Sequence, residues 1–182
     1  MITFAEIINI LITIFAVGFI FSGLVRRPDS LSRYFGGGFN WGDIKFSIMV
    51  TAPAIILHEF GHKLVALSLG YTAVYHAAWW WLAIGVFLRL ANVGFIFLAP
   101  AFVSISGPLI PINLAVIAFA GPLVNLILFL SCHFLIKHDK FTKYTHVIHL
   151  TKQINLWLFI INMLPIPGFD GFKTYAALFS MI

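Results

Sequence analysis

Two histidines separated by three residues give the clearest chemical signal in this sequence. The segment reads His58-Glu59-Phe60-Gly61-His62, and residues four apart on a helix share a face, with Cβ atoms about 5 to 6 Å apart. Both imidazoles can therefore reach one metal ion. A catalytic zinc ion needs a third protein ligand and one position left for water. Glu59 is offset by one residue, so it can take a proton from that water without binding the metal.

A chance pair of helical histidines beside a glutamate is the alternative interpretation. The surrounding segment, about residues 46–69, is apolar and long enough to cross a membrane. Ionisable groups at that depth cost about 2.5 to 3.5 kcal/mol each on insertion scales, so they usually mark function or a water-filled cavity. The apolar setting therefore favours a metal site over coincidence.

The end of the last apolar stretch offers a further metal ligand. It reads Asn162-Met-Leu-Pro165-Ile-Pro167-Gly-Phe-Asp170-Gly171. Its two prolines stop a helix, and irregular backbone at membrane depth must be buried or face water. The Asp170 carboxylate, held on that backbone, is a suitable third zinc ligand. Taken alone, however, the segment favours a different interpretation over a zinc ligand: Asp170 caps the terminal helix and Gly171 is a flexible turn.

Together, these motifs resemble those of the site-2 protease family of intramembrane zinc metalloproteases. That family combines an HExxH helix with a later segment of the pattern Asn-x-x-Pro-x-Pro-x-x-Asp-Gly, and both patterns match here at every defined position. Between them, Gly121-Pro122-Leu-Val-Asn125 looks like the Gly-x-x-x-Asn pattern of the family's intervening helix. The resemblance covers about residues 46–172, and it implies a minimal form, because no stretch is long enough for a PDZ or CBS domain.

The resemblance also implies roles for individual residues. It implies His58, His62 and Asp170 as the ligands of one zinc ion per chain, with Glu59 as the general base. This arrangement would hydrolyse peptide bonds within or near the transmembrane helices of a membrane-protein substrate. A zinc-binding pseudoprotease or scaffold is the alternative, but the sequence retains Glu59. A transporter should show repeated halves or paired broken helices, and only one motif-bearing break is found.

Two asparagines receive less specific roles. By resemblance, Asn125 and Asn162 help to hold the substrate backbone or the developing oxyanion. The alternative is hydrogen bonding between helices, worth about 0.6 kcal/mol on average in measured membrane cases. Gly121 is expected to permit close approach of helices, and Pro122 a local bend.

The composition places these motifs in a membrane protein. Hydrophobic residues make up 61% of the chain and charged residues 9%, whereas soluble domains carry roughly 25% charged residues. We therefore expect an all-α integral membrane protein, a bundle of about 4 to 6 transmembrane helices of the usual spanning length, forming a single membrane-embedded domain over residues 1–182 with its core at about 46–172. It should be multi-pass, in the cell membrane, with a retained first span.

Four apolar stretches predict spans at about residues 4–25, 46–69, 112–136 and 148–164, and an amphipathic helix is expected over 172–182. Residues 71–110 are broken up, which predicts one short span plus a re-entrant or extended segment. The extended part, Gly94 to Ser106, is expected to lie against the active site and to pair with an unwound substrate by β-augmentation. The Trp79-Trp80-Trp81 cluster should sit near a membrane interface.

The charges suggest contact with lipid headgroups. The formal net charge is +5, but the 11 Lys and Arg are scattered between helices, which favours anionic lipids over nucleic acid. Basic residues in 26–45 and 137–143 place both loops in the cytosol by the positive-inside rule, whereas the family resemblance implies the opposite orientation. Lys63 should extend toward water. Cys132 is the single cysteine, so no disulfide forms within the chain.

Overall fold

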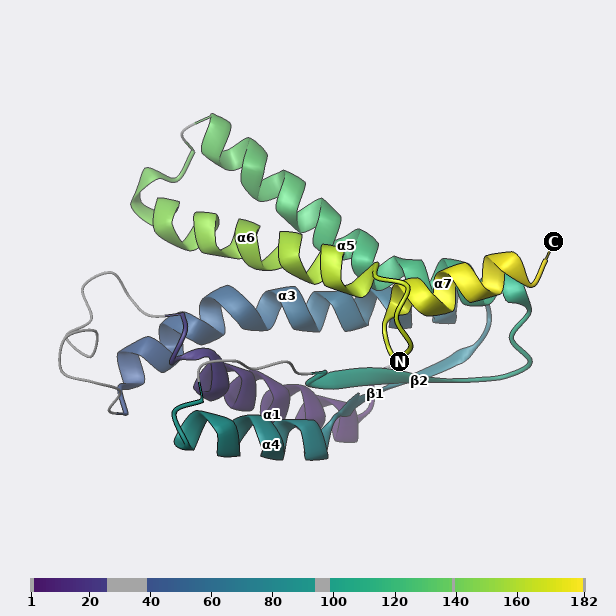
Figure 1. Ribbon diagram of the computed structural model, residues 1–182, viewed down its shortest axis with the longest axis horizontal. Helices are drawn as coiled ribbons and strands as arrows, with labels where there is room; N and C mark the ends of the chain where they lie inside the picture. The colour runs from purple at the N-terminus through teal and green to yellow at the C-terminus, as the bar shows by residue number, and fades with distance from the viewer. Residues whose placement is uncertain (1, 26–38, 94–98, 139, 182) are drawn as a thin grey trace. The chain divides into compact units, whose positions relative to one another are not determined.

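The computed structural model describes residues 2–25, 39–93, 99–138 and 140–181. Within these ranges the chain forms six α-helices, one short 3-10 helix and two strands (Figure 1). In chain order they are α1 (Phe4–Phe21), α3 (Trp41–Ser68), β1 (Thr72–Ala77), α4 (Trp79–Leu90), β2 (Ala101–Ser106), α5 (Pro111–Lys137), η1 (Thr142–Tyr144), α6 (Thr145–Asn162) and α7 (Asp170–Phe179).

Three of the described helices, α1, α3 and α5, are long and apolar enough to cross a membrane. Large apolar side chains on them are exposed, such as Phe15 at 58% and Leu130 at 53%, as expected for surfaces that face lipid. The predicted all-α membrane fold is therefore confirmed. Helix α6 covers the predicted last span, but its first half carries His146, His149 and Lys152; the number of crossings stays a prediction.

The first compact unit comprises residues 1–55 and 76–102. Helix α1 begins at a capping box, in which the Thr3 side chain accepts from the Glu6 N–H and Glu6 accepts from the Thr3 N–H at 2.9 Å. Helices α1 and α4 lie side by side within this unit (Figure 1). Asn9 of α1 accepts a hydrogen bond from the Ala77 N–H at 3.2 Å, which ties α1 to the end of β1.

The second compact unit comprises residues 56–75 and 103–182. Helices α5 and α6 run antiparallel, and α7 also packs on α5 (Figure 1). At Gly61 of α3, a Cβ would lie 2.8 Å from the Ala120 carbonyl oxygen of α5, so the two backbones approach closely there. A cluster of Ala66, Ala73 and Ile117 joins α3, β1 and α5 in a small apolar core.

The broken region between α3 and α5 forms a two-stranded sheet and a short helix. The Thr72 hydroxyl donates to the Ser106 carbonyl oxygen, and the Ser104 hydroxyl donates to the Val74 carbonyl oxygen. Strands β1 and β2 therefore pair antiparallel. Residues 101–106 of the predicted extended segment are therefore a strand, whereas residues 94–98 lie outside the described residues. Helix α4 has 12 residues, about 18 Å, which is too short to cross a hydrocarbon core of about 30 Å.

The environment of Lys63 differs from the expectation. Its side chain is 2% exposed, so the expectation that it extends toward water is wrong. Lys63 follows His62 on α3, and its buried side chain has an interaction partner within the protein. By contrast, the three consecutive tryptophans at the start of α4 are exposed, with Trp80 at 84%, in keeping with an interfacial position.

Candidate metal centre

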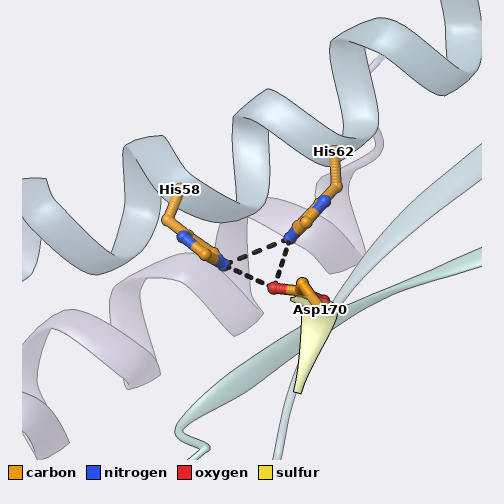
Figure 2. Close-up of side chains that lie close together, drawn as sticks. All are labelled: His58, His62 and Asp170. Atoms are coloured by element: carbon orange, nitrogen blue, oxygen red, sulfur yellow. Dashed lines mark hydrogen bonds and ion pairs between the residues drawn. The ribbon is translucent and has the colours of Figure 1, made fainter. Parts of the chain in front are cut away.

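Three side chains from two helices converge at one point of the second unit (Figure 2). His58 Nε2 lies 3.1 Å from His62 Nε2 and 3.1 Å from Asp170 Oδ2. His62 Nε2 lies 3.2 Å from the same Asp170 oxygen. All three residues are buried. The structure thus brings together the three residues that the sequence analysis proposed as metal ligands, although 108 positions separate His62 from Asp170.

Helix α3 sets the positions of the two histidines. One turn separates them, so both imidazoles leave the same face of the helix, with ring centroids 4.8 Å apart and ring planes at 83°. This perpendicular arrangement directs an Nε2 atom of each ring toward the Asp170 carboxylate (Figure 2). The geometry follows from the i, i+4 spacing read in the sequence.

The turn between α6 and α7 positions Asp170. Asp170 is the first residue of α7, and Phe169 rather than Asp170 occupies the N-cap position. The capping interpretation therefore does not describe this structure. A Cβ at Gly171 would lie 2.6 Å from the Met163 carbonyl oxygen, so glycine lets α7 begin directly against the end of α6. Tyr175 of α7 donates to that same carbonyl at 3.0 Å, which satisfies one of the acceptors freed by the helix break.

The other ring nitrogens of the histidines have acceptors as partners. His62 Nδ1 lies 2.8 Å from the backbone carbonyl oxygen of Ile117. Because a carbonyl oxygen can only accept, Nδ1 carries a proton, and in the neutral ring Nε2 then keeps its lone pair. His58 Nδ1 lies 2.6 Å from Asn125 Oδ1, with the same result. Such partners are typical of metal-ligating histidines, because they fix the tautomer and the ring orientation.

The donor set fits a zinc ion. His58 Nε2, His62 Nε2 and Asp170 Oδ2 lie 3.1 to 3.2 Å from one another. Three acceptor atoms this close repel one another unless a cation or a proton lies between them. In a tetrahedral site with bonds of about 2.0 to 2.1 Å, neighbouring donor atoms lie roughly 3.3 Å apart. The observed triangle is close to one face of such a tetrahedron.

Glycine at position 121 leaves the space that the imidazoles occupy. A Cβ there would overlap the His62 ring and lie 2.7 Å from His58 Nε2. From the sequence, Gly121 is expected only to permit close approach of helices. The structure gives it a more specific role, because a side chain at this position would displace the Nε2 atoms of both histidines.

The remaining predicted site residues occupy different environments. Glu59, next to His58 on α3, is half-buried and is not one of the three converging groups. Its role as general base stays a prediction. Asn162 is half-buried at the end of α6 and donates to the Leu158 carbonyl of its own helix at 3.0 Å. Asn125 is fully buried and bonds to α3 and α6, which is the interhelical alternative considered for it.

Two further polar residues connect to the three converging side chains, Lys173 directly and Asn155 through Asn125, and neither was predicted from the sequence. Lys173 Nζ lies 3.2 Å from Asp170 Oδ1, the carboxylate oxygen that the histidines do not contact. Asn155 of α6 is fully buried and accepts from Asn125 Nδ2 at 2.9 Å. A signal for Asn155 did exist, because it lies seven residues before Asn162, and residues seven apart share one helix face.

Comparison with known proteins gives one informative match. The chain is 33% identical over 172 residues to a protein of Methanocaldococcus jannaschii named "putative zinc metalloprotease", and the match covers 92% of this chain and 82% of the relative. No family model matches the chain. No solved structure matches it either.

Proposed function

Because this chain belongs to the zinc metalloprotease family of the Methanocaldococcus jannaschii relative and carries the motifs of the site-2 proteases, we propose that it is an intramembrane zinc metalloprotease. It hydrolyses peptide bonds within or near the transmembrane helices of other membrane proteins. The observation that carries this proposal is the convergence of His58, His62 and Asp170, with both histidines on a helix long and apolar enough to cross a membrane.

His58, His62 and Asp170 would hold the metal. A bound zinc ion supplies Lewis acidity, polarising the scissile carbonyl and lowering the pKa of water to about 7. Glu59 takes the proton of the attacking water and later delivers it to the leaving amine. Its place beside His58 on α3 supports this role, because it neighbours the site without being one of the three converging groups.

The substrate must unwind before it can be cut, because a helix hides its amides in internal hydrogen bonds. We propose that β2 receives the unwound segment by β-augmentation. Two observations support this. The sheet has only two strands in the part of the chain that the structure describes, so each strand has one edge without a strand partner. In addition, Val103 and Ile105 of β2 pack on the apolar cluster that includes α3 and α5 residues.

The protein works as a multi-pass component of the cell membrane in this proposal. The three apolar helices support insertion, and the exposed tryptophans at the start of α4 support an interfacial anchor. Its partners are the lipid bilayer and a transmembrane protein substrate. Helix-breaking residues near the cut should make such a substrate easier to cleave, because they lower the cost of unwinding.

The test measures zinc content together with cleavage of a model single-span substrate in liposomes. Wild type is compared with Glu59→Gln, which removes the base and keeps a similar shape, and with His58→Ala, which removes a ligand. We expect about one zinc in wild type and in Glu59→Gln, little zinc in His58→Ala, and cleavage by wild type only.

Other results would point elsewhere. Zinc bound by wild type without cleavage of a panel of helices would favour the pseudoprotease or scaffold. Wild type that binds no zinc would overturn the metal assignment itself. Cleavage that persists in Glu59→Gln would remove Glu59 from its proposed role.

A further inference from the structure

Two buried side-chain amides, those of Asn125 and Asn155, connect His58 to α6 by hydrogen bonds. Asn125 Oδ1 lies 2.6 Å from His58 Nδ1. Asn125 Nδ2 then donates to Asn155 Oδ1 at 2.9 Å, and Asn155 Nδ2 donates to the Thr151 backbone carbonyl at 2.8 Å. Both asparagines are 0% exposed. These contacts connect three helices, α3, α5 and α6. Only the last acceptor, the Thr151 carbonyl, is a backbone group.

The Thr151 carbonyl, the last acceptor, determines which way each amide group is oriented. A backbone carbonyl cannot donate, so the Thr151 carbonyl oxygen must accept from the NH2 group of Asn155. The Asn155 side-chain oxygen then faces Asn125. That oxygen in turn holds the NH2 group of Asn125 and turns its oxygen toward His58. An oxygen at that place accepts from the His58 Nδ1 proton, which in the neutral ring leaves the lone pair on Nε2. The orientation of each group thus follows from the one before it.

The reverse arrangement would remove a metal ligand. A side-chain amide has two orientations of nearly the same shape, related by exchange of oxygen and nitrogen. If Asn125 were flipped, its NH2 group would face His58 Nδ1, and the ring would then carry its proton on Nε2. That nitrogen could no longer bind a metal. His62 does not have this vulnerability, because its partner is the Ile117 backbone carbonyl, which cannot flip.

We propose that Asn155 is a positioning residue of the metal centre: acting through Asn125, it holds His58 in the tautomer whose Nε2 is free to bind the metal. This inference rests on the metal centre of the proposed function. It assigns to α6, which supplies none of the three ligands, a part in setting metal affinity.

The test compares three variants of the full chain in detergent. Asn155→Leu removes the acceptor for Asn125 at similar volume. Asn155→Asp keeps an oxygen toward Asn125 in either protonation state. Asn113→Leu is the matched control, because Asn113 is a half-buried asparagine of α5 whose Nδ2 donates to the Tyr71 hydroxyl at 2.9 Å, away from the histidines.

Two readouts are taken, and neither is cleavage. Zinc affinity is measured by competition with a chelator, and the His58 tautomer is measured by ¹⁵N NMR of the zinc-free protein, with the His58 signals identified by their loss in His58→Ala. We expect Asn155→Leu to weaken zinc binding about 10- to 100-fold, the usual effect of losing an outer partner of a ligand, and to populate the Nε2–H tautomer. Asn155→Asp and Asn113→Leu should stay close to wild type in both.

An Asn155→Leu protein with wild-type zinc affinity and an unchanged tautomer would overturn the inference. Equal losses in Asn155→Leu and Asn155→Asp would also overturn it, because they would show that α6 packing matters rather than the direction of the amides. If wild type binds no zinc, the proposed metal centre fails, while the tautomer measurement, made without metal, still decides the role of Asn155.

Discussion

Lys173 and Asp170 lie one turn apart at the start of α7, with Lys173 Nζ 3.2 Å from Asp170 Oδ1. The histidines contact the other carboxylate oxygen, Oδ2. Lys173 therefore contacts one carboxylate oxygen while the other faces the two histidines. Its side chain is 52% exposed, so solvent screens the pair, and exposed ion pairs contribute only about 0 to 1 kcal/mol.

Replacing Lys173 with Met should have a small effect on zinc binding. Because the pair is screened, we expect zinc affinity to fall by no more than about five-fold, the equivalent of roughly 1 kcal/mol. Chelator competition measures this, and Lys152→Met on α6 is the control for loss of a cation. A loss of 100-fold or more would mean that Lys173 holds Asp170 far more tightly than a screened pair can.

The Gly121→Ala change should abolish zinc binding. Its Cβ would lie within the space of the two imidazoles, so at least one ring must rotate away from the ligand position. We expect zinc content well below one per chain, with helix content by circular dichroism close to wild type. Leu123→Ala, on an exposed position of the same helix, is the control. Full zinc content in Gly121→Ala would contradict the close approach of α5 to the histidines.

Zinc removal should lower the thermal stability of the protein. A ligand that binds only the folded state stabilises it by about 2.7 kcal/mol at a free concentration 100 times its Kd. Chelated protein should therefore unfold at a lower apparent temperature, and added zinc should restore the original value. The His58→Ala variant should show no such rise with zinc, because one of three ligands is missing; an equal rise there would indicate binding elsewhere.

Proline substitutions in β2 should separate substrate binding from metal binding. Successive residues of a strand direct their N–H groups to opposite edges, so Val103→Pro and Ser104→Pro remove donors from different edges. Proline is tolerated where the N–H faces away from the partner strand. One of the two variants should therefore keep its zinc but lose most of its cleavage of a single-span substrate.

The second proline variant should disturb pairing with β1 and reduce folding as a whole. Zinc content and cleavage are measured on both proteins in liposomes. Parallel loss of zinc and cleavage in both variants would argue against β-augmentation, and so would wild-type cleavage in both.

Local spacing was enough to identify most of the site. The pair His58 and His62 depends only on the helical repeat, and the apolar length of α3 depends only on composition. The prolines before Asp170 fix a helix end regardless of what surrounds it. For these reasons the membrane class and the candidate ligands could be predicted from the sequence, and the structure brings those ligands together.

Contacts between helices were decided only by the tertiary structure. The bond between Asn125 and Asn155, the space at Gly121 and the burial of Lys63 depend on which faces of α3, α5, α6 and α7 meet. Helical periodicity gives the direction of a side chain around its own axis but not the rotation or depth of the neighbouring helix. The sequence by itself therefore determined which groups are candidate metal ligands, and packing determined which amides and glycines lie against those groups.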